Sequence, residues 1–219
     1  MKILCVSDQI DPLIYTNSLK QRYGDVDLIL SAGDLPLDYL DFIMSTLNKP
    51  LLFVFGNHHT DLFTLYKDGP SSLDRNEMEN HVFSTAYADS KIVKEAGLLV
   101  AGLGGCMKYN MGRNQFTDFQ MKMKLIKLIP SLIINRIFRG RYLDILLTHA
   151  SPFGIHDKDD LCHRGFKDFL WFMRVFKPRY LIHGHIHLYD YSAKRISKYH
   201  DTLIVNAFSH YIIDTGDDK

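Results

Sequence analysis

Short apolar segments recur along the chain, and each of them ends in a polar residue or a glycine. The segments are rich in β-branched residues and apolar on both faces, which is typical of strands buried between two layers. The clearest of them span residues 2–7, 27–32, 51–55, 98–102, 143–148 and 180–183. We therefore expect strands at these positions.

Helix-like spacing of apolar residues separates several of these segments. The stretches with this spacing are 12–23, 37–47 and 165–176. Towards the end, residues 188–199 and 202–215 alternate between apolar and polar positions, which predicts two β-hairpins. The order predicts an α/β fold in which two packed mixed β-sheets are flanked by helices. This is a four-layer α/β/β/α sandwich, formed by one domain over residues 1–219.

Composition fits an ordinary globular protein and narrows the function classes. Hydrophobic residues make up 46% of the 219 residues and charged residues 23%, proportions that a disordered or membrane-embedded chain would not have. The formal net charge of +1 argues against dedicated nucleic-acid binding, which normally requires a strong basic excess. A small phosphorylated substrate remains compatible with it, because the local field decides there.

Compartment signals favour the cytoplasm. No segment reaches the roughly 18 apolar residues of a transmembrane helix, and the pattern of a signal peptide is missing. Three cysteines, an odd number without a CxxC pair, are typical of reduced thiols; they are Cys5, Cys106 and Cys162. We expect a cytoplasmic protein without a transmembrane segment.

Metal-ligating residue types follow five of the predicted strands. Carboxylate, amide and imidazole groups are the oxygen and nitrogen ligands that suit Mn, Fe, Zn and similar divalent ions. Any one of them has a structural explanation, such as a helix N-cap or a turn residue. The ordered series favours a metal site at one sheet edge. In chain order its members are Asp8, Asp34 after Gly33, Asn57 and His58 after Gly56, His149, and His185 with His187.

This order of motifs (Asp, Gly-Asp, Gly-Asn-His, His and Gly-His-x-His) resembles the signature of the calcineurin-like metallophosphoesterase family. The resemblance extends from Asp8 to His187, and its most specific pieces, Gly-Asn-His and Gly-His-x-His, are intact. It implies a β-sandwich flanked by helices that holds two divalent ions, bridged by an Asp and a hydroxide. Such a pair, about 3.5–4 Å apart, activates water at neutral pH and holds the phosphoryl oxygens during in-line attack.

The resemblance also implies a role for each motif residue. Asp34 would be the bridging carboxylate. His58 would lie near the phosphate as an electrostatic stabiliser or as the proton donor to the leaving oxygen. The other implied ligands are Asp8 and His187 for the first metal, and Asn57, His149 and His185 for the second.

The first motif departs from the family pattern. The family has Asp-x-His, whereas this chain reads Asp8-Gln9-Ile10, and an isoleucine side chain cannot bind a metal. The first metal would then keep its remaining ligands and water, or recruit a neighbour such as Gln9 or Asp11. A second departure is His59, where the family often has an acid.

The segment after His149 contains candidates for substrate binding. Within residues 150–165, Arg164 could hold a phosphate oxygen through its planar fork, and His163 or His156 could donate a hydrogen bond to one. The alternative is a solvated loop that caps the following helix.

Two further segments allow a functional and a structural interpretation. The glycine-rich loop at 102–106 could cradle a phosphate with its N–H groups, but a tight connection between strands is favoured. Residues 119–141 are basic and amphipathic, and Pro130 interrupts them. Two ordinary helices with buried apolar faces are favoured there over peripheral contact with anionic lipid.

Together the motifs predict a hydrolase, a metal-dependent phosphoesterase that acts by attack of a metal-bridging hydroxide. Manganese is among the expected metals. A phosphodiester is favoured over a monoester, because no dense arginine cluster suited to a dianion is evident. The alternative is a catalytically silent scaffold of this fold that binds a protein partner, which Ile10 favours. The pattern makes no prediction of oligomeric state.

Overall fold

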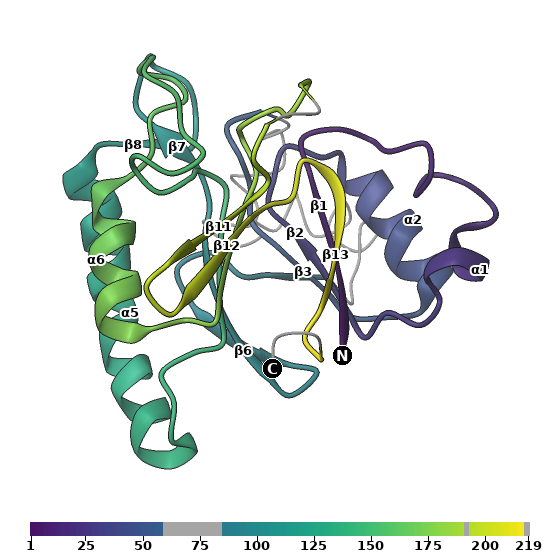
Figure 1. Ribbon diagram of the computed structural model, residues 1–219, viewed down its shortest axis with the longest axis horizontal. Coiled ribbons are helices and arrows are strands. Elements are labelled where there is room, and N and C mark those ends of the chain that lie inside the picture. Colours follow the sequence, from purple (N-terminus) through teal and green to yellow (C-terminus); the bar gives the residue numbers. More distant parts are fainter. Residues whose placement is uncertain (59–84, 191–192, 217–219) are drawn as a thin grey trace, which may run out of the picture.

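The computed structural model describes residues 1–58, 85–190 and 193–216, which form two β-sheets packed face to face with helices on both outer faces (Figure 1). The helices are α1 (Leu19–Tyr23), α2 (Leu37–Leu47), α5 (Asp118–Arg139) and α6 (Lys167–Phe176). In spatial order, the first sheet contains β13 (Ser209–Asp214), β1 (Lys2–Ser7), β2 (Leu28–Ser31), β3 (Leu51–Phe53) and β4 (Thr85–Tyr87). The second contains β11 (Ile196–Tyr199), β12 (Thr202–Asn206), β10 (Tyr180–His183), β9 (Ile145–Thr148), β6 (Leu98–Leu103) and β5 (Ile92–Glu95). A separate small pair consists of β7 (Cys106–Met107) and β8 (Gln115–Phe116).

Both sheets are mixed. In the first, β1 to β4 run parallel and β13 lies antiparallel beside β1. In the second, β12, β10, β9 and β6 run parallel, and antiparallel β11 and β5 form the two edges. Parallel strands deliver the segments that follow them to the same edge of a sheet, which is where ligands bind in such folds.

Both faces of the central strands are buried. In β1, Ile3 and Cys5 pack between the sheets with residues such as Ile145, whereas Leu4 and Val6 pack with the apolar side chains of α1 and α2. The helices α5 and α6 cover the outer face of the second sheet. This four-layer arrangement confirms the predicted fold class, and burial on both faces explains the continuous apolar segments.

The predicted helix over residues 12–23 is wrong for most of its length, because only Leu19–Tyr23 is helical. Upstream, the Asp11 carboxylate accepts a hydrogen bond of 2.8 Å from the backbone N–H of Leu13. An aspartate that bonds the backbone two residues on stabilises a turn in place of a helix.

The predicted break at Pro130 is also wrong, because α5 is one helix of 22 residues with Pro130 inside it. A capping box between Thr117 and Gln120 begins the helix, and Pro130 is exposed. Tertiary packing of one apolar face outweighs the hydrogen bond that proline cannot make. The buried side chains on that face are Met121, Leu125, Leu128 and Leu132.

Neither of the two predicted hairpins, within residues 188–199 and within 202–215, forms, because the one hairpin at the end of the chain joins a strand from each segment. The strands β11 and β12 pair as an antiparallel hairpin, but β13 pairs with β1 in the other sheet. Alternation of apolar residues indicates a strand with one face covered, and it cannot specify which strand lies beside it.

In the described parts of the chain, no helix is long and apolar enough to span a membrane.

Candidate metal centre

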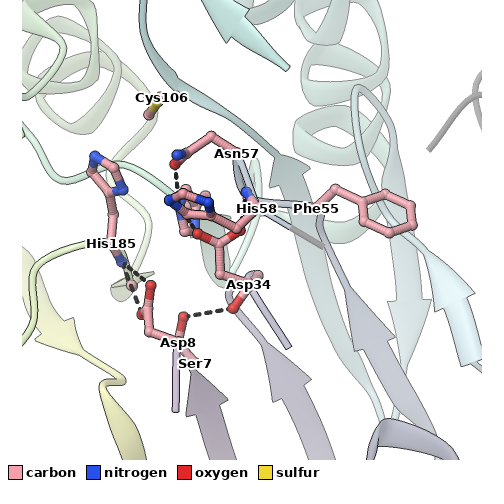
Figure 2. Close-up of polar contacts among 12 residues, drawn as sticks. Ser7, Asp8, Asp34, Phe55, Asn57, His58, Cys106 and His185 are labelled. Carbon is pink, nitrogen blue, oxygen red and sulfur yellow. Dashed lines mark hydrogen bonds and ion pairs between the residues drawn. The ribbon is translucent and has the colours of Figure 1, made fainter. Parts of the chain in front are cut away.

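Five predicted ligands lie at the ends of five strands. Asp8 follows β1, Asp34 follows β2, Asn57 follows β3, His149 follows β9 and His185 follows β10. Figure 2 shows Asp8, Asp34, Asn57 and His185 gathered around one space. The two sheets therefore contribute to one site, as the positions of these residues after strands predict.

Sharp backbone turns bring the side chains back over the sheet edge. Asp8, Asp34 and His185 have φ angles of 64°, 57° and 65°, in the left-handed region that costs a non-glycine residue about 1–2 kcal/mol. At Gly56, a β-carbon would collide with the Asp34 carboxylate, so only glycine permits this close approach. Backbone strain concentrated in this way is typical of functional sites.

His149 is fully buried, and its ring is oriented by the segments that follow β2 and β3 of the other sheet. Its Nδ1 lies 2.8 Å from the carbonyl oxygen of Ala32 and donates to it. Its Nε2 lies 3.3 Å from Oδ2 of Asp34 and 3.2 Å from Oδ1 of Asn57. Three atoms thus face one another, and each can offer a lone pair to a cation: Nε2 of His149, Oδ2 of Asp34 and Oδ1 of Asn57.

Electrostatics favour a positive charge between these atoms. Burial works against ionisation of Asp34, but His149 and the backbone N–H of His58 outweigh it and hold the pKa of the carboxyl well below its usual range. Burial lowers the pKa of His149, and the Asp34 carboxylate reverses this and raises the pKa to about 9. A protonated ring can satisfy both oxygens. The same arrangement suits a divalent cation.

His185 is held in a similar way from the opposite side. Its Nε2 lies 2.8 Å from the carbonyl oxygen of Cys162, which leaves Nδ1 as the ligating atom. Its backbone N–H donates to both carboxylate oxygens of Asp8, at 3.0 and 2.9 Å. Its ring lies 4.8 Å from that of His149, centroid to centroid. Burial and His149 lower its pKa to about 4, so the ring is neutral and able to bind a metal.

The donor set fits a divalent metal. Ligand atoms of Asp34, His149 and His185 all lie within 4.8 Å of one another, and Asn57 adds an amide oxygen. In each histidine the other ring nitrogen donates a hydrogen bond to a backbone carbonyl, which is how metal-binding histidines are usually oriented. The residues that would hold an ion here are carboxylate, amide and neutral imidazole.

On the other side of the site the Asp8 side chain is buried, but its partner His187 is open to solvent. His187 Nε2 lies 3.7 Å from Oδ1 of Asp8, and the His187 side chain is 40% exposed. Its Nδ1 lies 2.8 Å from the hydroxyl of Tyr189, and its ring stacks on Phe208. Ile10 is 42% exposed, so no packing role explains its presence next to Asp8.

Asp11 does not serve as the replacement ligand considered above. Its Oδ2 accepts hydrogen bonds from Ser209, at 2.6 Å, and from His210. The interactions with Ser209, His210 and the Leu13 N–H outweigh burial and lower the pKa of this carboxyl. Asp11 thus joins the loop after β1 to β13. Gln9 is exposed.

A family model for calcineurin-like phosphoesterases matches residues 1–189. The chain belongs to this family. No curated protein sequence matches it.

Solved structures share the fold of this calcineurin-like phosphoesterase at low sequence identity. One crystal structure has a TM-score of 0.68 at 14% identity and covers 100% of this chain and 96% of its own. The protein TT1561 of Thermus thermophilus has a TM-score of 0.62 at 14% identity, over 95% of this chain and 89% of its own. A novel archaeal phosphodiesterase has a TM-score of 0.50 at 15% identity, over 100% and 96%. Likeness at these identities concerns the fold.

The predicted substrate residues lie at different distances from the candidate metal centre. His58 donates its backbone N–H to Oδ1 of Asp34 at 2.7 Å, and the residue is exposed. The ring of His163 is tilted by 38° to that of His185, with 5.2 Å between ring centroids, and its Nδ1 contacts Asp160 at 2.9 Å. Their roles stay predictions. His59 lies outside the described residues.

Arg164 and His156 point elsewhere. The exposed Arg164 places its guanidinium 5.5 Å from the ring centre of Phe153. His156 Nδ1 lies 2.9 Å from Nε2 of His183, and its Nε2 lies 2.9 Å from the hydroxyl of Ser197. Both imidazoles are held neutral. Burial and Lys194 lower the pKa of His156 to about 4, and burial and His156 lower that of His183 to about 3.

Asn114 and Tyr109 hold the loop that carries Asn57, although the motifs did not assign them this role. Asn114 Nδ2 donates to the carbonyl oxygens of Phe55, at 2.9 Å, and Gly56, at 2.8 Å. The amide nitrogen of Asn57 donates to the Tyr109 hydroxyl at 3.3 Å. In the sequence, the only signal for this role is that both residues belong to a polar segment that follows the glycine-rich loop at 102–106.

The glycine-rich loop is a structural connection. The N–H of Gly104 donates to Asp89 at 2.7 Å, and that of Gly105 donates to the carbonyl oxygen of Phe55 at 2.9 Å. These N–H groups are therefore committed to the protein, and the favoured interpretation agrees with the structure.

Proposed function

We propose that the chain is a divalent-metal-dependent hydrolase of phosphate esters, with water as the nucleophile and phosphodiesters favoured over monoesters. The observation that carries the proposal is the meeting of His149 Nε2 with the oxygens of Asp34 and Asn57, 3.3 and 3.2 Å away. Nδ1 of this buried imidazole already donates to Ala32, so Nε2 meets the two acceptors with a proton when no ion is bound. A cation satisfies all three atoms at once.

The chain's own residues position and polarise the substrate. Divalent ions bound there would lower the pKa of water and neutralise the charge on phosphoryl oxygens. In Asp34, Oδ1 is fixed by the His58 N–H and Oδ2 faces His149. The exposed His58 ring is available to donate a proton to the leaving oxygen.

A cavity beside His187 supports a substrate with a second ester arm. It has a volume of about 500 Å³, and its lining includes one acid, Asp157, beside Lys158, Lys194, Lys198, His156 and His187. No carboxylate lies within ion-pair distance of these three lysines among the described residues. A diester has a group on each side of phosphorus, and a cavity adjoining the centre can hold one of them.

The test is Mn²⁺-dependent hydrolysis of bis-p-nitrophenyl phosphate by the wild-type chain and by Asn57→Ala. We expect turnover that needs metal and that falls by more than about 100-fold in the variant, because ligand loss costs more than the 10–100-fold of an outer partner. Asn110→Ala is the control, since Asn110 is exposed and its side chain bonds Gly112 and Gln115 and not a predicted ligand.

A silent scaffold is the second candidate, and exposed Ile10 beside Asp8 favours it. Absence of turnover with each of Mn²⁺, Fe²⁺, Co²⁺, Ni²⁺ and Zn²⁺ would reject the phosphoesterase proposal. Metal binding without turnover, measured by calorimetry, would then identify a metal-loaded scaffold.

A further inference from the structure

Helix α5 has apolar side chains on two opposite faces. One face packs into the core through Met121, Leu125, Leu128 and Leu132. The other face is exposed, and we call it the outer stripe. Its side chains are separated mostly by three, four or seven residues, with two adjacent pairs, so they follow one side of the helix. The outer stripe consists of Phe119, Met123, Ile126, Ile133, Ile134, Ile137 and Phe138.

The exposure of the outer stripe is high and concentrated. Phe138 is 80% exposed, and Ile137 and Phe119 are each 70% exposed. Of the 15 exposed large hydrophobic residues in the described parts of the chain, 7 belong to this single helix. Scattered exposed apolar residues need no explanation, but a continuous patch of this kind marks an interaction surface.

Positive charge flanks the outer stripe. The helix contains five Lys and Arg residues and one acidic residue. Lys122 and Lys127 project on opposite sides of the stripe, at about 100° per residue around the helix. Lys122 lies 3.6 Å from Asp168, whereas Lys127 has no carboxylate partner in the part of the chain that the structure describes. An apolar strip bordered by cations on a helix surface is suited to an anionic interface.

A second copy of the chain fits this surface poorly. Two outer stripes packed together would bring the cations of both helices into one interface, where like charges repel. A lipid surface with anionic headgroups supplies the opposite charge, and its fluid chains accept isoleucine and phenylalanine side chains without matching pockets. At 1.5 Å per residue the helix is about 33 Å long, enough for all seven side chains to reach the interface together.

We propose that the outer stripe docks the protein onto anionic membranes, with α5 lying in the plane of the interface. The contact is peripheral and leaves the two sheets outside the bilayer. It is independent of the metal centre, because none of the stripe residues contributes to that site. Figure 1 shows α5 on the outer side of the second sheet, across the molecule from α1 and α2.

The experiment is cosedimentation of the full chain with vesicles of phosphatidylglycerol and phosphatidylcholine in equal parts, against vesicles of phosphatidylcholine alone. We expect binding only to the anionic vesicles and a fall in binding with salt. Replacing both Ile137 and Phe138 by aspartate should reduce binding by more than about 10-fold, because it removes apolar contact and adds negative charge. Lys127→Gln should reduce it by about fivefold.

Leu13→Asp is the matched control, since Leu13 is 48% exposed, lies between β1 and α1 and receives the same substitution. It should bind vesicles as the wild type does. Thermal unfolding of each variant shows whether the fold is kept. Equal binding by the Ile137/Phe138 double variant and the wild type would overturn the proposal. So would a stable dimer that the double variant dissociates, because the stripe would then be covered by a second copy.

Discussion

The candidate metal centre has two halves, one around His149 and an open half around Asp8 and His187. They differ in how firmly the protein holds the predicted ligands. Around His149, every ligand is buried or anchored: Asn57 by Tyr109, and His149 and His185 by backbone carbonyls. Around Asp8, the facing His187 is 40% exposed, and Ile10 adds no ligand. One half is therefore preorganised for a cation, whereas the other depends on fewer ligands. Preorganisation by outer partners is a property of the surrounding fold and not of the motif residues alone.

The largest expected effect separates the two halves directly. His149→Ala should lower Mn²⁺-dependent activity by more than about 100-fold, whereas His187→Ala should lower it by about 10-fold. The reason is that His149 connects Asp34 and Asn57, while His187 is a peripheral partner of Asp8. Steady-state rates against Mn²⁺ concentration measure this, and equal losses would mean that the halves do not differ as we describe.

Acidification should destabilise the ion-free protein, because the buried His183 and its partner His156 are neutral in the folded state. His183 and His156 have pKa values of about 3 and about 4 when folded, against 6.5 unfolded. Because the folded values are lowered, their contribution is complete above pH 6.5 and declines as the pH falls towards the folded values. The free energy of unfolding should fall by up to about 1 kcal/mol per pH unit because of His183. The effect of His156 is smaller, because water reaches its side chain. Urea unfolding with a chelator present, from pH 6.5 to 5, measures the decline, because above pH 6.5 the raised pKa of His149 gives stability the opposite pH dependence. His185, whose pKa is also lowered, adds to the same decline. A flat profile would contradict the neutral pair.

Asn114→Gly tests the anchoring of the loop that carries Asn57. Glycine keeps the positive φ of 53° at this position and removes the two hydrogen bonds to Phe55 and Gly56. We expect a loss of about 1–3 kcal/mol in the free energy of unfolding and a weaker affinity for Mn²⁺. Asn48→Gly is a matched control, because Asn48 also has a positive φ, of 52°, at the end of α2. A variant that loses stability but keeps metal affinity would limit Asn114 to a structural role.

The smallest effect concerns the open half. Ile10→His should tighten Mn²⁺ binding there by about 10-fold, since it restores the imidazole that the family motif has. Ile10→Leu is the control and should leave affinity unchanged. Calorimetric titration of both variants resolves the difference. Unchanged affinity in Ile10→His would mean that another group already completes the open half.

Much of the fold and of the site follows from the sequence, because both depend on local pattern. Strands buried on two faces are continuously apolar, as in β1, and chemistry-bearing residues such as Asp34 and His149 come directly after them. The departure at Ile10 is equally visible without a structure. These features need no knowledge of which segments lie beside one another.

Only the tertiary structure decided the rest. Pro130 stays inside α5 because packing of Met121 and Leu125 outweighs one missing hydrogen bond. β13 pairs with β1, and Asn114 holds the loop before Asn57, because contacts between residues far apart in sequence leave no periodic trace. The same holds for the outer stripe of α5. Its apolar residues are evident in the chain, but which face of the helix the core covers is decided by long-range packing.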